Sequence, residues 1–180
     1  MPSINPQVIL VDQDDNPIGT MEKYQAHREG QLHRAFSVFL INRQQQILLQ
    51  QRSPKKYHSP LLWSNTCCSH PLPEEDIITA AKRRLFEELG IEVTQLEIID
   101  RFHYKKSFDN GMTENEMDYV VVGTIADAQF NLNPDEVAAL RWLALDEIEV
   151  QLKQDVDNFT YWFPQALQIL KSFLNPTVLK

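Results

Sequence analysis

The chemically richest segment of this sequence lies between residues 63 and 91. Residues 67–70 read Cys-Cys-Ser-His, and Pro71 and Pro73 follow, a composition typical of a loop. A thiol can exchange a proton or act as a nucleophile, whereas an imidazole binds metals or carries a proton near neutral pH. The pattern therefore predicts a reactive loop that leads directly into the next element of the chain.

A helix is expected to follow this loop and to end just before Gly90. Pro73 near its start, the acidic residues 74–76 in its first turn and a glycine just past its end are the usual start and stop signals. Apolar residues at three- and four-residue spacing predict its buried face: Ile77, Ile78, Ala81, Leu85 and Leu89.

Two charged residues fall at the margin of this face. At about 100° per residue, Arg84 and Glu88 lie where the helix meets its packing partner, while Arg83 is expected to point away. The simpler interpretation of Arg84 and Glu88 is an ordinary i,i+4 ion pair, worth about 0.3 kcal/mol.

A second acidic group lies on a predicted strand. Glu114, Glu116 and Asp118 alternate along it, so their side chains share one face. Like charges at this spacing repel unless a cation or a proton lies between them. The alternative is a solvent-facing edge strand with alternating charge.

Three histidines complete a candidate metal site. His27, His33 and His70 with Glu114 and Glu116 offer five ligands, which would suit an octahedral divalent ion with one open position. The alternative is that the histidines are ordinary surface residues of three loops.

The elements that must position these residues alternate between strands and helices. Apolar runs predict strands over residues 7–11, 35–41, 46–51, 93–104, 114–125 and 140–145, with 35–41 and 46–51 forming a hairpin. Helices are expected over 22–27, in a short segment capped by Asp146, and over 159–174. The fold class is α/β (α+β), with a mixed sheet flanked by helices.

Length and composition limit the remaining possibilities. A chain of 180 residues with 43% hydrophobic residues suits one domain, residues 1–180, with a substantial core. A net charge of -8 argues against nucleic-acid binding, and no apolar run has membrane length. Because the two cysteines are adjacent and the N-terminus lacks signal-peptide features, we expect a cytoplasmic protein without a structural disulfide. A monomer or weak dimer is expected.

The segment from Ser69 to Ile91 resembles the Nudix box, G-x5-E-x7-R-E-U-x-E-E-x-G-U, in which U is apolar. Two positions depart from it: Ser69 replaces the first glycine, and Arg84 replaces a glutamate. Because Nudix hydrolases gather helix glutamates around divalent metals, Arg84 argues against such a hydrolytic cluster. The matching positions are Glu75, Arg83, Leu85, Glu87, Glu88, Gly90 and Ile91.

With C-x-H just ahead of this box, the chain resembles the type 1 isopentenyl diphosphate isomerases over nearly its whole length. The resemblance implies a Nudix-like fold, a mixed sheet sandwiched between helices. It also implies a role in isoprenoid biosynthesis, the reversible conversion of isopentenyl to dimethylallyl diphosphate. That reaction adds one proton and removes another through a carbocation, in a site that excludes water.

The resemblance assigns catalytic roles. Cys68 takes the position of the catalytic thiol, and Cys67 is expected to pack in the core. We place Glu116 and Tyr104 on one side of the substrate and Cys68 on the other, with Trp162 as an aromatic face for the carbocation. Glu116 is expected to be the acid in the forward direction and Cys68 the base, an order that the sequence leaves open.

The resemblance also assigns ligands. In the family the matching histidines and the E-x-E pair bind Mn²⁺, Mg²⁺ or Zn²⁺, which here means His27, His33, His70, Glu114 and Glu116. A second ion, Mg²⁺, is bound together with the substrate diphosphate at the positions of the Cys68 carbonyl and Glu88. Lys23, Arg52 and Lys56 match the basic residues that bind the substrate, and Arg84 is a further candidate.

Two other functions are open at this point. A Nudix hydrolase of a nucleoside diphosphate-type substrate would use the same fold, although Arg84, C-x-H and E-x-E argue against it. A non-catalytic binding module is the second alternative. The presence of Cys68, Tyr104, Glu114 and Glu116 together argues against that function.

Overall fold

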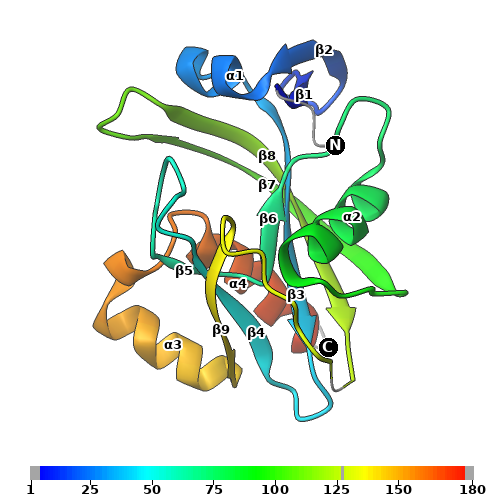
Figure 1. The fold of residues 1–180 in the computed structure, drawn as a ribbon, viewed down its shortest axis with the longest axis vertical. Coiled ribbons are helices and arrows are strands. Elements are labelled where there is room, and N and C mark those ends of the chain that lie inside the picture. Colours follow the sequence, from blue (N-terminus) through cyan, green and yellow to red (C-terminus); the bar gives the residue numbers. More distant parts are fainter. Residues whose placement is uncertain (1–4, 127, 177–180) are drawn as a thin grey trace.

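The computed structural model describes residues 5–126 and 128–176, and strand β3 (His33–Ile41) lies at its centre (Figure 1). Strand β8 (Thr113–Thr124) runs parallel to β3, from the pair His33↔Glu116 to the pair Ile41↔Thr124. The other edge of β3 pairs with three antiparallel strands in succession. These are β1 (Gln7–Val11), β6 (Cys67–Ser69) and β4 (Ile47–Arg52).

Four further strands extend this mixed sheet. They are β2 (Pro17–Glu22) beside β1, β7 (Leu96–Ser107) beside β8, and both β5 (Trp63–Ser64) and β9 (Val137–Leu143) beside β4. The predicted hairpin between residues 35–41 and 46–51 is confirmed at its turn, where Ile41 pairs with Ile47. Beyond that pair, β4 diverges and pairs with β9 and β5 instead.

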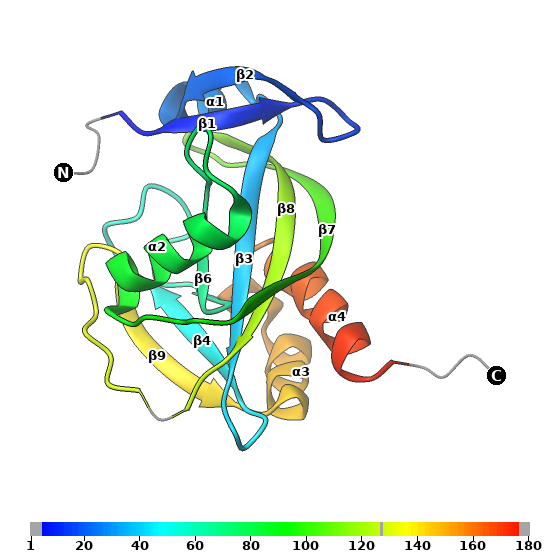
Figure 2. The same cartoon turned by 90° about the vertical axis from the view of Figure 1, so that its right-hand side faces the viewer.

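Helices cover both faces of the sheet. Helix α2 (Ile77–Leu89) packs on one face, and helices α3 (Leu145–Gln154) and α4 (Phe163–Leu174) pack on the other (Figure 2). Helix α1 (Lys23–Glu29) lies at one end, next to β1 and β2, and a 3₁₀ turn (Val156–Asn158) joins α3 to the approach of α4. The predicted mixed sheet between helices is therefore confirmed.

Strand β3 is buried on both faces, and its alternating side chains separate two cores. Phe36, Val38 and Leu40 pack toward α2, whereas Phe39 and Ile41 pack toward α3 and α4. The candidate catalytic residues belong to the second face.

Helix α2 begins later than the sequence indicates. Asp76 is its N-cap, with a side chain that accepts a hydrogen bond from the Thr79 amide at 2.9 Å. The predictions that residues 74–76 form the first turn and that Pro73 lies near the first helical position are therefore wrong. Glu74 has a φ of 66°, which prevents helix at that point. The predicted buried face is confirmed except for Ile78, which is half-buried.

The segment around the two cysteines is a strand and not a loop. Residues 67–69 pair with residues 36–38 of β3, which satisfies backbone groups that a loop would leave to water. Likewise β7 continues past Tyr104 to Ser107, because its last residues pair with the start of β8.

Two predicted helix starts also shift. Helix α4 begins at Phe163 and not at Phe159, because residues 159–160 form a bridge and a backbone hydrogen bond with Trp63. Asp146 lies inside the first turn of α3, whose N-cap is Ala144. Strand β2, mostly exposed and containing Gly19, had no sequence signal.

Replacement of Gly90 by alanine is expected to lower the free energy of unfolding by about 2 kcal/mol or more. Gly90 ends α2 with a φ of 68°, and a Cβ there would lie 2.7 Å from the Asn131 Cβ and 2.9 Å from its carbonyl oxygen. Urea denaturation measures the change. Gly111, with a φ of 82° and no atom of the described residues within 4 Å of its Cβ position, is the matched control. Equal losses in the two alanine variants would show that the Asn131 contact adds nothing.

Candidate active site

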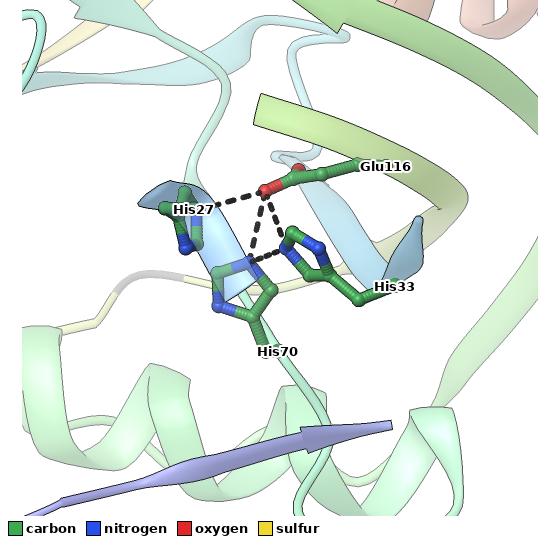
Figure 3. Close-up of side chains that lie close together, drawn as sticks. All are labelled: His27, His33, His70 and Glu116. Atoms are coloured by element: carbon green, nitrogen blue, oxygen red, sulfur yellow. Dashed lines mark hydrogen bonds and ion pairs between the residues drawn. The ribbon is translucent and has the colours of Figure 1, made fainter. Parts of the chain in front are cut away.

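Four metal-ligating side chains from four separate segments converge on one point (Figure 3). His27 comes from α1, His33 from the start of β3, His70 from the residue after β6, and Glu116 from β8. Their ligand atoms all lie within 4.8 Å of one another. The Glu116 Oε1 atom lies 2.9 Å from His70 Nε2, 3.3 Å from His33 Nε2 and 3.6 Å from His27 Nε2.

The backbone fixes the outer nitrogens of two of these rings. His27 Nδ1 lies 2.7 Å from the Lys23 carbonyl oxygen, and His33 Nδ1 lies 2.8 Å from that of Gln31. Because a carbonyl oxygen only accepts, each Nδ1 carries the proton, and in the neutral ring each Nε2 directs a lone pair at the cluster.

The charges of this cluster suit a cation. Burial is the main cause that lowers the pKa of His70, to about 3, so that ring is neutral. Burial alone would raise the pKa of Glu116, but the surrounding imidazoles, His70 foremost, outweigh it and hold the pKa well below its usual value. His27 Nε2 is among the buried atoms of the described residues that lack a hydrogen-bond partner. Converging lone pairs, one carboxylate and an unsatisfied nitrogen fit a divalent metal ion.

Glu114 lies beside this cluster and outside the four converging groups. Its Oε2 atom lies 3.2 Å from the Tyr104 hydroxyl, which also donates to Glu116 at 2.7 Å. Its Oε1 atom lies 3.0 Å from Nε2 of His58. Burial and the neighbouring Glu116 raise the pKa of Glu114 well above its usual value. The shared face of these glutamates is confirmed, but β8 is an inner strand and not an exposed edge.

Strand β6 sends the two thiols to opposite faces of the sheet. Cys67 is buried in the core against α2, as predicted, whereas Cys68 faces α4. The Cys68 thiol donates to Asn65 Oδ1 at 3.0 Å and accepts from Trp162 Nε1 at 3.2 Å. Ser64 Oγ lies 3.7 Å from the same sulfur.

Asn65 sets the orientation of this thiol. Its Nδ2 group donates to the carbonyls of Val38 and Cys67, at 3.2 and 2.9 Å, which leaves Oδ1 to accept from Cys68. Burial and the nearby Asp118 carboxyl raise the pKa of Cys68 to about 12. Cys68 is therefore a thiol, and its S–H donates to the Asn65 amide oxygen.

The four predicted basic residues gather at the same place. Lys23, Arg52, Lys56 and Arg84 all line a pocket whose other walls carry the groups described above. Burial and the neighbouring cations lower the pKa of Lys23 to about 8. Nε atoms of Arg52 and Arg84 are buried and unpaired among the described residues. Four cations, two of them with an unpaired buried donor, fit an anionic ligand.

One pocket thus unites most of the residues predicted to form the site. Those that line it are Lys23, Arg52, Lys56, Cys68, His70, Arg84, Tyr104, Glu114, Glu116 and Trp162. His27 and His33 join through the metal-ligating cluster, and Glu88 joins through its ion pair with Arg84.

Comparisons with known proteins agree with this geometry. Residues 31–163 match the model of the NUDIX domain. The curated isopentenyl-diphosphate Delta-isomerase of Pectobacterium atrosepticum is 46% identical over 157 residues, which cover 87% of each chain. That of Aliivibrio fischeri is 44% identical over 174 residues, 93% of this chain and 96% of the relative. The chain belongs to the isopentenyl-diphosphate Delta-isomerase family.

Solved structures support the fold of this family member. A Deinococcus radiodurans protein superposes with a TM-score of 0.65 at 20% identity, over 82% of this chain and 89% of that one. The MutT protein of Methanosarcina mazei superposes with a TM-score of 0.66 at 16% identity, over 80% and 96%. At these identities the likeness shows the Nudix fold and nothing about the reaction.

Arg84 changes the charge pattern of α2 in this family member. Its guanidinium donates to Glu88 at 2.6 Å and to Glu87 at 2.7 Å, so both glutamates of α2 are ion-paired. Glu88 is 2% exposed and also accepts from Gln50 at 2.9 Å. The predicted position of Glu88 at the margin of the packed face is confirmed. Its side chain is more deeply buried than that position indicated.

Arg83 does not point away from the protein, contrary to the prediction. Its Nε and Nη2 atoms donate to the two carboxylate oxygens of Glu75, at 2.8 and 2.9 Å. A bidentate pair of this kind joins the segment before α2 to the middle of the helix. The helix periodicity gave no indication of it, because Glu75 lies outside the helix.

The residues of the site that were not predicted include His58, Asn65 and Gln50. His58 follows Lys56 closely in the sequence, and Asn65 precedes the cysteines within the same segment. Proximity in sequence to predicted site residues was therefore the signal that could have identified both. Gln50 is a polar residue within a buried strand, a pattern that indicates a satisfied internal contact. Within the described residues, no helix has the length and apolarity needed to cross a bilayer.

Proposed function

We propose that this chain converts isopentenyl diphosphate reversibly to dimethylallyl diphosphate, a step of isoprenoid biosynthesis. The observation that carries the proposal is one pocket that holds a thiol, a Tyr–Glu pair and four cations. The cations suit the diphosphate, and the remaining groups suit proton exchange with a small hydrocarbon. Curated relatives at 46% and 44% identity carry the name of this activity.

Proton transfer is assigned to two sides of the substrate. Glu116, in contact with the Tyr104 hydroxyl, exchanges one proton, and Cys68 exchanges the other. Because the reaction is reversible, the group that donates in one direction accepts in the other. Trp162 is held by its indole N–H, which donates to Asn65 at 3.1 Å and to Cys68 at 3.2 Å. Its ring supplies a π face for the positive charge of the intermediate.

Two metal sites are part of the proposal. His27, His33, His70, Glu114 and Glu116 would hold Mn²⁺, Zn²⁺ or Mg²⁺, which offsets the negative charge of the paired glutamates. A Mg²⁺ ion that arrives with the diphosphate would be held by the Cys68 carbonyl and Glu88. Arg84, which lines the same pocket, would then turn from Glu88 toward the phosphates.

The assay is conversion of isopentenyl diphosphate, followed by chromatography of the two isomers in the presence of Mg²⁺ and Mn²⁺. Chelation is expected to abolish the conversion, and re-addition of the two metals to restore it. Phosphate release from nucleoside diphosphate sugars, without any isomerisation, would instead support a Nudix hydrolase.

The setting of the reaction follows from the same observations. We infer a small-molecule substrate and a cytoplasmic location, because both cysteines are free and Cys68 must remain a thiol. A single domain over residues 1–180 and a monomer or weak dimer stay predictions.

The Lys56→Met variant is expected to bind inorganic pyrophosphate at least about tenfold more weakly than the wild type, one charge-assisted contact being worth about 1.5–3 kcal/mol. Lys56 lines the pocket with a side chain 17% exposed, although it also pairs with Glu136. Lys55→Met is the matched control, because that neighbour is 68% exposed and pairs with the exposed Asp135. Isothermal titration calorimetry measures both. Equal weakening in the two variants would contradict a specific role for Lys56.

A further inference from the structure

Glu114 is a buried acidic group of the pocket whose contacts come from two neutral side chains, Tyr104 and His58. It is 3% exposed, and the Tyr104 hydroxyl beside it carries a single proton that lies closer to Glu116, at 2.7 Å, than to Glu114, at 3.2 Å. Among the described residues, its other partner is His58, at 3.0 Å. A buried carboxylate without a donor is costly, so the contact with His58 matters for where Glu114 points.

His58 is itself held firmly. It lies between β4 and β5 and is 7% exposed, with its ring stacked on Phe108 at a centroid distance of 5.1 Å. Arg52 donates to the His58 carbonyl at 3.2 Å, and Asn110 donates to the carbonyl of the preceding Tyr57 at 2.8 Å. The segment is therefore fixed both to the cationic side of the pocket and to the turn between β7 and β8.

The chemistry of the contact defines which nitrogen acts. A carboxylate accepts, so His58 Nε2 must carry a proton, while Nδ1 lies 3.4 Å from the Ser59 hydroxyl. With Nε2 directed at Glu114, the His58 ring supports a carboxylate that lies beside the four converging groups, and it is not a ligand itself. This is the arrangement in which an outer hydrogen bond sets the direction of a metal-binding group.

We propose that His58 is a positioning residue, whose Nε2–H donates to Glu114 and holds this carboxylate beside the three-histidine cluster, from where it would complete the metal site. The inference rests on the proposed function for its catalytic consequence, but its effect on metal binding stands apart from it. His58 thereby couples the segment that carries Arg52, at the end of β4, and Lys56 to the metal-binding end of the pocket.

Two substitutions separate the hydrogen bond from the ring packing. His58→Phe keeps an aromatic ring against Phe108 and removes the donor, whereas His58→Gln keeps an N–H donor at a similar reach and removes the ring. His103→Phe is the control, because His103 is exposed and bonds the neutral Asn115 side chain at 2.7 Å.

Binding of Mn²⁺ alone, titrated by electron paramagnetic resonance, is the primary measurement, with kcat and KM for isopentenyl diphosphate as the second. We expect His58→Phe to weaken Mn²⁺ binding by about 10–100-fold and to lower kcat while KM changes little. His58→Gln recovers most of the affinity, and His103→Phe matches the wild type.

Wild-type Mn²⁺ affinity in His58→Phe would overturn the inference, as would equal losses in His58→Phe and His58→Gln. Near-UV circular dichroism shows whether each variant is folded. If the phenylalanine variant is not folded, the Mn²⁺ affinity of the glutamine variant tests the role of His58. If the wild type binds Mn²⁺ but does not isomerise isopentenyl diphosphate, the proposed function fails while the metal titrations still decide the role of His58.

Discussion

The Cys68→Ala variant is expected to lose isomerase activity by a factor of about 10²–10⁴, the usual contribution of a positioned acid or base. Its thiol donates to Asn65 Oδ1 and its sulfur accepts from Trp162, so alanine removes the group that exchanges a proton on that side of the substrate. KM is expected to change little, because the cations that hold the diphosphate are untouched. Steady-state kinetics and a thermal melt measure activity and stability separately.

Cys67→Ala is the matched control for this experiment. Cys67 neighbours Cys68 in the chain but is buried against α2, on the opposite face of the sheet. Its replacement is expected to cost about 1 kcal/mol of unfolding free energy and to leave kcat within a factor of about two. A fully active Cys68→Ala protein would contradict the role of the thiol, and an inactive but folded Cys67→Ala protein would contradict the assignment between the two.

Glu116→Gln is expected to lower isomerase activity by about 10²–10⁴-fold and to weaken Mn²⁺ binding by about tenfold or more. Glutamine preserves the shape of the side chain but removes the negative charge that three imidazole nitrogens surround within 3.6 Å. It also ends the exchange of a proton with the Tyr104 hydroxyl, which lies 2.7 Å from Glu116. Kinetics at saturating metal separate the loss of proton transfer from the loss of the ion.

Glu97→Gln serves as the control, because Glu97 is exposed on β7. It is expected to behave as the wild type in both measurements. Full recovery of Glu116→Gln activity at high Mn²⁺ would show that the carboxylate only holds metal, and would remove its assigned part in proton transfer.

The local parts of the site could be predicted from sequence. The apolar spacing of α2 and the C-cap at Gly90 follow from helix periodicity, and the common face of Glu114 and Glu116 follows from the two-residue period of a strand. Cys68 could be distinguished from Cys67 only through the resemblance to a family, because their local sequence surroundings are the same.

The parts of the site that depend on long-range contacts could not be predicted from the sequence. Strand β6 is only three residues long and contains no apolar alternation, so its existence depends on pairing with β3. The burial of Glu114 and Glu116 also escaped the pattern, because alternating charge indicates an exposed strand. Tertiary partners, the histidines and Tyr104, offset the cost of that burial, and no local pattern reveals them.

The parallel pairing of β3 with β8 has a consequence for how this family can diverge. Nine consecutive pairs run from His33↔Glu116, at the site, to Ile41↔Thr124, at the far end of the core. An insertion or deletion of one residue within either strand would turn every later side chain to the other face, and a deletion in β8 ahead of Glu116 would place Met117 where Glu116 belongs. Length variation among homologues should therefore be confined to connections such as residues 42–46 and 108–112, while the two strands change by substitution alone.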